Sequence, residues 1–239
     1  MRQGITLKNL INILFCAYIL LLPFEEAIAF HGVTALRVVS LALIGLCLIA
    51  SKGTISFKDF LLPLFIWMLF SLCSFLWAES FEESWRFYRI YLIQFVMIIM
   101  LFSLPKGFIS MKSTATSFIV SGFISSFLIF VLPTSTITKE GRRTVALFGT
   151  ALDPNLVGGI IIIAILFALL FFFDENRKRK ILYLFIVGFE LFGMLLTGSR
   201  GSLLSLAIGL LALLLLKRKN LLKNIKTFNV SVQMQPTEL

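Results

Sequence analysis

The chain has 239 residues, of which 59% are hydrophobic and only 14% charged, and its formal net charge is +10. A soluble domain carries about 25% charged residues, so a single soluble core could not bury this apolar excess. The basic residues lie in short clusters between apolar runs, without an aromatic-interleaved basic domain, which argues against nucleic acid as a partner. The composition therefore predicts a membrane protein surrounded by lipid.

Apolar runs of nearly membrane-crossing length follow one another along the chain. Leu156 to Phe173, for example, is close to the about 20 residues that cross ~30 Å of hydrocarbon as a helix. No run alternates polar and apolar residues as barrel strands do. We therefore expect an all-α fold, a polytopic transmembrane helix bundle forming one membrane domain over residues 1–239. About eight spans are expected, near 5–24, 33–50, 60–78, 87–104, 114–132, 156–173, 181–197 and 202–216, followed by a tail over 217–239.

The first apolar run has a second interpretation. Arg2 and Lys8 precede it and 27–29 (Ala-Ile-Ala) follow it, as in a signal peptide with its cleavage site. Glu25 and Glu26 argue against that interpretation, and the other seven spans would keep their topology in either case.

The loops between the spans alternate in charge. With the eight spans above, 15 of the 22 basic residues fall on the side of the N-terminus, including 177–180 (Arg-Lys-Arg-Lys) and 217–219 (Lys-Arg-Lys). Loops rich in Lys and Arg stay in the cytoplasm. We therefore expect a multi-pass protein of a bacterial inner (plasma) membrane, with the N-terminus, the C-terminus and the 217–239 tail in the cytoplasm.

The basic residues of the opposite, outer side are mostly arginines. Arginine holds phosphate and carboxylate oxygens through two parallel hydrogen bonds, so the bias points to an anionic ligand, although pairing with outer acids would also explain it. Three of these arginines, Arg37, Arg89 and Arg200, lie near predicted starts of helices that point their positive dipole ends outward. The outer set is Arg37, Arg86, Arg89, Arg142, Arg143 and Arg200, with Lys139 as its lysine.

Two of the outer helix starts have distinctive local sequences. At the sixth span, Asp153 suits an N-cap, Pro154 suits the first helical position, and Asn155 follows. Between the last two spans, residues 197–201 (Thr-Gly-Ser-Arg-Gly) predict a tight turn in which Ser199 caps the next helix and Arg200 is presented outward. Capping alone would explain the first motif, whereas a tight turn does not need an arginine.

Other polar residues have ordinary alternatives. Glu190 lies inside the seventh span, where an ionisable group is costly and marks a functional candidate, or else a protonated or hydrogen-bonded residue packed near Gly188 and Gly193. His31 is expected to be an interfacial loop residue. Trp77 and Trp85 fit an aromatic belt at the outer interface. The three cysteines lie in apolar runs and make no disulfide framework or zinc spacing. We expect neither a metal nor another cofactor.

The two motifs together resemble those of a known family. Residues 147–159 (LFGTALDPNLVGG) opening one helix, and 195–204 (LLTGSRGSLL) between two others, resemble the O-antigen ligase and polysaccharide polymerase superfamily. The outer segment from Trp77 to Arg89, and Arg37, are also similar to that family, so the resemblance extends from the first span to Leu216.

The resemblance implies a metal-independent glycosyltransferase of the GT-C type acting at the outer membrane face. Its substrate would be a glycan on undecaprenyl diphosphate, transferred to lipid A core or to another repeat unit in lipopolysaccharide or exopolysaccharide biosynthesis. The diphosphate-binding role would fall to Arg200, Ser199, Arg142, Arg143, Arg37 and Arg89, with Asp153 and Asn155 in the helix-start motif. No catalytic residue can be assigned.

The chain also departs from the family, whose members continue through further spans and a large outer loop with a histidine taken as the catalytic base. We therefore expect either a truncated or split member, completed by a downstream polypeptide, or a protein that binds or helps to move lipid-linked glycan without catalysis. Whether the chain is an enzyme is left open, and an unrelated transporter is the third alternative.

Overall fold

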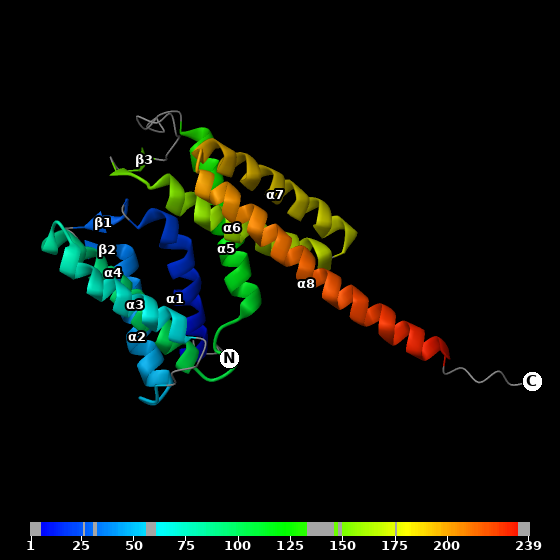
Figure 1. Ribbon diagram of the computed structural model, residues 1–239, viewed down its shortest axis with the longest axis horizontal. Helices are drawn as coiled ribbons and strands as arrows, with labels where there is room; N and C mark the ends of the chain where they lie inside the picture. Colours follow the sequence, from blue (N-terminus) through cyan, green and yellow to red (C-terminus); the bar gives the residue numbers. More distant parts are fainter. Residues whose placement is uncertain are drawn as a thin grey trace, which may run out of the picture. The chain divides into compact units, whose positions relative to one another are not determined.

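The computed structural model describes residues 6–25, 27–30, 33–55, 61–132, 146–147, 150–174 and 176–233. Within them the chain is almost entirely helical, as expected, with two short antiparallel strand pairs (Figure 1). It divides into two compact units, which we describe separately. Unit 1 is Met1–Ser121 with Ala146–Leu152, and unit 2 is Gly122–Val145 with Asp153–Leu239. The single membrane domain stays a prediction.

Unit 1 is built mainly from four helices and the first half of a fifth. Side chains that recur at helical spacing on α1, α2 and α4 form its core, which contains Ile11, Leu43 and Met97. The Ser110 amide donates to Asn12 Oδ1 at 2.9 Å, which fixes the start of α5 to α1. The elements are α1 (Leu7–Leu21), η1 (Leu22–Phe24), β1 (Ala29–Phe30), β2 (Val33–Thr34), α2 (Ala35–Ala50), α3 (Leu62–Cys73), η3 (Ser74–Trp77), α4 (Phe81–Ser103), the first half of α5 (Met111–Val131), β3 (Ala146–Leu147) and β4 (Thr150–Ala151).

The start of α4 differs from its predicted position. The span was predicted from residue 87, but the helix begins at Phe81, because Ser80 caps it by accepting the Glu83 amide at 3.3 Å and because Glu82 and Glu83 suit the positive end of the helix dipole. Hydropathy marks where a helix becomes apolar, whereas capping marks where it begins. The first turns of α4 are therefore amphipathic and precede its apolar part.

Unit 2 contains the second half of α5 with α6 (Pro154–Asp174), α7 (Arg177–Thr197) and α8 (Arg200–Gln233). Most buried side chains of α6 follow helical spacing, namely Val157, Ile160, Ile161, Ala164, Ile165 and Ala168, and Ile162 is buried as well. Close packing with α8 occurs where Gly158 faces Ser202 and Gly209 faces Leu166. Since the contact advances along both helices together, α6 and α8 run in the same direction.

The helix α5 packs against α7 in the same manner. An added Cβ on Gly122 would lie 3.0 Å from Glu190 Oε1, and one on Gly193 would lie 2.5 Å from Ser126 Oγ. Moving one turn along α5 therefore matches moving one turn along α7, so these two helices are also parallel. The pairs α5/α7 and α6/α8 are thus each parallel, and the orientation of the helices in a membrane stays a prediction.

The last helix extends beyond its predicted end. Residues 217–239 were expected to form a tail after a span ending at Leu216, but α8 continues without a break to Gln233. The basic run at 217–219 ends the apolar part of the helix without ending the helix, since Lys and Arg are good helix formers.

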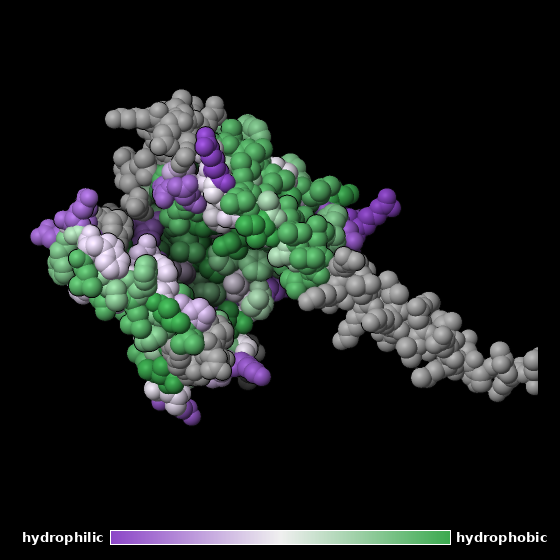
Figure 2. All heavy atoms as spheres, viewed as in Figure 1, coloured by the Kyte–Doolittle hydropathy of each residue, from purple (hydrophilic) through white to green (hydrophobic). Residues whose placement is uncertain are grey.

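Among the described residues, five helices are long and apolar enough to cross a membrane, namely Leu7–Phe24, Phe81–Ser103, Met111–Val131, Pro154–Phe173 and Arg177–Thr197. The apolar helices Ala35–Ala50, Leu62–Trp77 and Arg200–Leu216 are shorter, so the count of eight spans stays a prediction. Figure 2 shows mostly hydrophobic side chains on the visible face of α7 and on that of α8 up to Leu216, with hydrophilic residues near the helix ends. A surface of this kind is suited to contact with lipid.

Candidate functional site

The start of α6 is capped as its sequence predicts. Asp153 precedes the helix and its Oδ1 accepts the Asn155 amide at 2.8 Å, while Pro154 occupies the first helical position. The Asp153 carbonyl accepts the first helical hydrogen bond, from Val157. One carboxylate oxygen of Asp153 is therefore engaged by the backbone, and the Asn155 side chain remains exposed beside it.

The turn between α7 and α8 consists of Gly198 and Ser199. Gly198 adopts φ +63°, a left-handed backbone conformation. Glycine adopts it freely, whereas other residues adopt it only at a cost in free energy. Ser199 then caps α8, since its Oγ accepts the Ser202 amide at 3.2 Å. Gly201 is helical and does not share the special conformation of Gly198. The predicted cap is confirmed, and one of the two glycines has the predicted role.

A hydrogen-bond network joins the starts of α6 and α8. The Ser199 hydroxyl donates to Asn155 Oδ1 at 2.9 Å and accepts from the Ser202 hydroxyl at 2.9 Å, in addition to the Ser202 amide. A hydroxyl has one donor and two acceptor positions, so Ser199 Oγ is fully engaged. Gly158 leaves room for Ser202, because an added Cβ would clash with its hydroxyl. We call Asn155, Ser199 and Ser202 the seryl network.

Arg200 is the first residue of α8 and follows Ser199 directly. Its side chain is exposed, and among the described residues no carboxylate forms an ion pair with it. The first amides of a helix have no intrahelical acceptor, and here the amides of Arg200 and Gly201 are in that position. Among the described residues, nothing lies within 4 Å of a Cβ added to Gly201, so this side of the first turn of α8 has free space. The arrangement can hold an anion.

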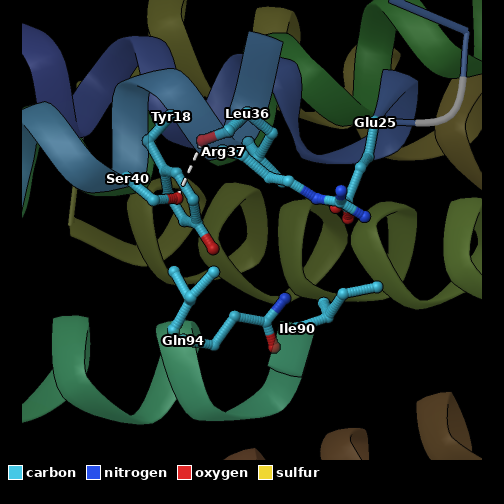
Figure 3. Close-up of a pocket in the computed structure, with 8 residues that line it drawn as sticks. Tyr18, Glu25, Leu36, Arg37, Ser40, Ile90 and Gln94 are labelled. Carbon is cyan, nitrogen blue, oxygen red and sulfur yellow. Dashed lines mark hydrogen bonds between the residues drawn. The ribbon is translucent and has the colours of Figure 1, made fainter. Parts of the chain in front are cut away.

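A second set of polar side chains lines a small pocket within unit 1, between α1, α2 and α4. Figure 3 shows the Arg37 guanidinium and the Glu25 side chain pointing toward one another, with the Tyr18 hydroxyl and the Gln94 amide facing the same space. Arg37 lies in the first turn of α2, whose cap Thr34 accepts the Arg37 amide at 3.3 Å. The sequence placed Arg37 at this helix start, but it gave no indication of Tyr18 or Gln94.

Arg89 is not at a helix start, contrary to the prediction. Because α4 begins at Phe81, Arg89 lies about two turns inside the helix, where its guanidinium stacks 5.8 Å from the centre of the Trp85 ring. Trp85 in turn packs against Phe75 and Tyr88, and Trp77 is exposed nearby in sequence. Whether these rings form an aromatic belt at the outer interface stays a prediction.

The structure therefore brings together part of the predicted site. Asp153, Asn155, Ser199 and Arg200 meet in unit 2, whereas Arg37 and Arg89 belong to unit 1. Arg142, Arg143 and His31 lie outside the described residues. The sequence analysis did not single out Ser202. Its position three residues after Ser199 is nevertheless the one whose backbone amide a capping serine accepts. Within the described residues, no cluster of three His, Cys, Asp or Glu side chains is placed to hold a metal.

No family model, curated protein or solved structure matches the chain. The fold and the composition define its class, which is a helical membrane protein with several apolar helices of membrane-crossing length.

Proposed function

We propose that the chain is an O-antigen ligase-like or polysaccharide polymerase-like membrane protein, which binds an undecaprenyl-diphosphate-linked glycan at the outer face of a bacterial inner membrane and takes part in its transfer. In this proposal both termini are cytoplasmic. The observation that supports it best is the exposed Arg200 at the first position of α8, held beside the seryl network that joins two helix starts.

The chemistry of a diphosphate suits this place. An anion at a helix N-terminus is stabilised by free backbone N–H groups and by the helix dipole. A guanidinium adds two parallel charge-assisted hydrogen bonds, which a single ammonium group cannot reproduce. During transfer the departing diphosphate gains negative charge, and fixed groups of this kind lower the energy of that state.

Within this proposal Ser199 has a positioning role. Its hydroxyl is already fully engaged by Asn155 and Ser202, so it has no hydrogen left to donate to a phosphate oxygen. By joining the two helix starts it fixes the backbone from which Arg200 projects. Loss of Ser199 should therefore weaken ligand binding indirectly.

A second candidate function is binding or transport of the lipid-linked glycan without transfer. The observation that favours it is the engagement of Asp153, the carboxylate beside the network, as the cap of α6. Transfer to a sugar hydroxyl benefits from a general base held within hydrogen-bond reach, typically by about 100- to 10,000-fold. An Asp153 carboxylate held as a cap is a poor candidate for that base.

The test is binding of undecaprenyl diphosphate to the purified full chain in lipid nanodiscs. Arg200→Lys should weaken binding about tenfold, since a hydrogen bond to a charged group contributes about 1.5–3 kcal/mol. Arg177→Lys is the matched control, because Arg177 is likewise exposed at the first position of its helix, α7. Equal affinities of the two variants would refute the assignment. Adding a glycan-loaded donor and an acceptor to the same nanodiscs separates transfer from binding alone.

A further inference from the structure

Glu190 is a buried carboxyl group that the proposed site does not use. It lies in the interior of α7, and its side chain is 0% exposed. Neither Oε1 nor Oε2 has a hydrogen-bond partner among the described residues. A buried polar group without a partner is rare and calls for an explanation.

The surroundings of Glu190 form a seam of small residues between α5 and α7. Gly122 on α5 faces the carboxyl, and one turn further along both helices Gly193 faces Ser126, whose Oγ is also buried without a partner. Ala164 on α6 closes the third side, since it lies against Gly122. Two polar groups that lack partners therefore occupy one seam.

No charged group faces Glu190 from the helices of unit 2. There is no ionisable side chain on α5 between 113 and 131, on α6 between 154 and 173, or on α8 between 201 and 216. On α7 itself the nearest are Tyr183, about two turns away, and the basic residues at 177–180 beyond it. The backbone N–H groups along the seam are engaged in their own helices. No counter-charge for an ionised Glu190 is present in these segments.

An ionised carboxylate in such a place would be far more costly than a neutral one, because an isolated buried charge loses its hydration without compensation. A metal cation would need several oxygen ligands, and the described residues contain no cluster of three acidic, His or Cys side chains. A proton needs only the carboxylate itself.

We propose that Glu190 is a proton-binding site in the interior of the bundle, whose occupancy is coupled to closure of the α5–α7 seam. With the seam closed the group is the neutral acid. When α5 separates from α7 and water enters, the O–H bond breaks, the proton leaves to water as hydronium, and the electron pair stays on the carboxylate. Any event that opens the seam then releases a proton, and a proton gradient can favour one of the two states.

The first experiment is infrared spectroscopy of the full chain in lipid at neutral pH. The carbonyl stretch of a protonated carboxyl group absorbs at a different frequency from the stretching bands of carboxylates. The wild type should show this band and Glu190→Gln should lack it. Glu82→Gln, at an exposed glutamate in the first turn of α4, is the matched control and should retain it. Absence of the band from the wild type, or its persistence in Glu190→Gln, would overturn the proposal.

The second experiment follows the equilibrium between closed and unfolded chain as pH rises. The closed bundle keeps the proton on Glu190 and the unfolded chain releases it, so the closed state should lose stability with rising pH, by up to tenfold in the equilibrium constant per pH unit. In Glu190→Gln this dependence should disappear. Equal slopes in the two proteins would refute the coupling even if the infrared band were present. Neither experiment uses the glycan lipid, so both are independent of the proposed function.

Discussion

Gly193 offers the sharpest test of how unit 2 is packed. A Cβ at this position would lie 2.5 Å from Ser126 Cβ and 2.9 Å from Ser126 Cα. Carbon atoms in contact prefer about 3.5–4.0 Å, so α5 and α7 must separate by roughly 1 Å in Gly193→Ala. Backbone cannot rotate away as a flexible side chain would. Such overpacking costs about 1–3 kcal/mol.

A glycine in a helix also gains about 1 kcal/mol in helix propensity when it becomes alanine, and this gain must be separated from the strain. Gly188 lies on the same helix, and nothing is within 4 Å of a Cβ added there. The difference between Gly193→Ala and Gly188→Ala therefore isolates the strain, and we expect the former to be less stable by about 1–3 kcal/mol.

The assay is reversible unfolding of the full chain in mixed micelles, followed by circular dichroism as the fraction of denaturing detergent rises. The double variant Gly193→Ala with Ser126→Gly should recover part of the loss, because it removes Ser126 Cβ and Oγ, the two closest contacts of the new methyl group, and leaves the contact with Cα. If Gly193→Ala unfolds at the same detergent fraction as Gly188→Ala, the close approach of α5 and α7 is wrong.

Four further predictions concern the helix starts and the topology. Gly158→Ala should displace the Ser202 hydroxyl from Ser199 and speed amide exchange at the start of α8, whereas Gly159→Ala, with nothing within 4 Å of its Cβ, should leave exchange unchanged; equal rates would contradict the network. Gly198→Ala should lower the free energy of unfolding by about 1–2 kcal/mol because of its left-handed backbone, while Gly201→Ala should not, and thermal unfolding distinguishes the two. Asp153→Ala should cost about 1 kcal/mol and Asp153→Asn much less in the same assay, since asparagine also caps helices; equal losses would show that the cap contributes little. A reporter active only outside the cytoplasm should be silent when fused after Leu216 and active within residues 133–155, and the reverse result would invert the predicted topology.

Much of the fold could be predicted because helices of membrane-crossing type are recognisable in a sequence by their length and their apolar composition. Each of the eight predicted segments corresponds to a helix, and the caps at Asp153 and Ser199 are where their sequences indicate. The errors have a common cause. Hydropathy measures where a segment becomes apolar, so it missed the polar first turns of α4 at Phe81 and the helical continuation of α8 to Gln233.

The side-chain arrangement was beyond what the sequence could predict. The helix α6 is apolar on nearly every side, so no periodic pattern shows which face meets α8, and the Asn155–Ser199 contact joins residues 44 positions apart. Glu190 was recognised as unusual, and packing near Gly193 was expected. The structure adds that no described residue lies within 4 Å of a Cβ added to Gly188, and that the carboxyl meets Gly122 on α5, a contact that no spacing within α7 reveals.

The parallel packing of α8 against α6 also constrains the order in which the protein is assembled. The helices α6 and α7 are consecutive and antiparallel, so they can pair as soon as both have left the ribosome. Ser199 precedes α8 whereas Ser202 lies in its first turn, so the hydrogen bonds between these two serines form only after the start of α8 has been synthesised and has docked beside α6. The seryl network is therefore completed after the Asp153 cap, which needs only the start of α6.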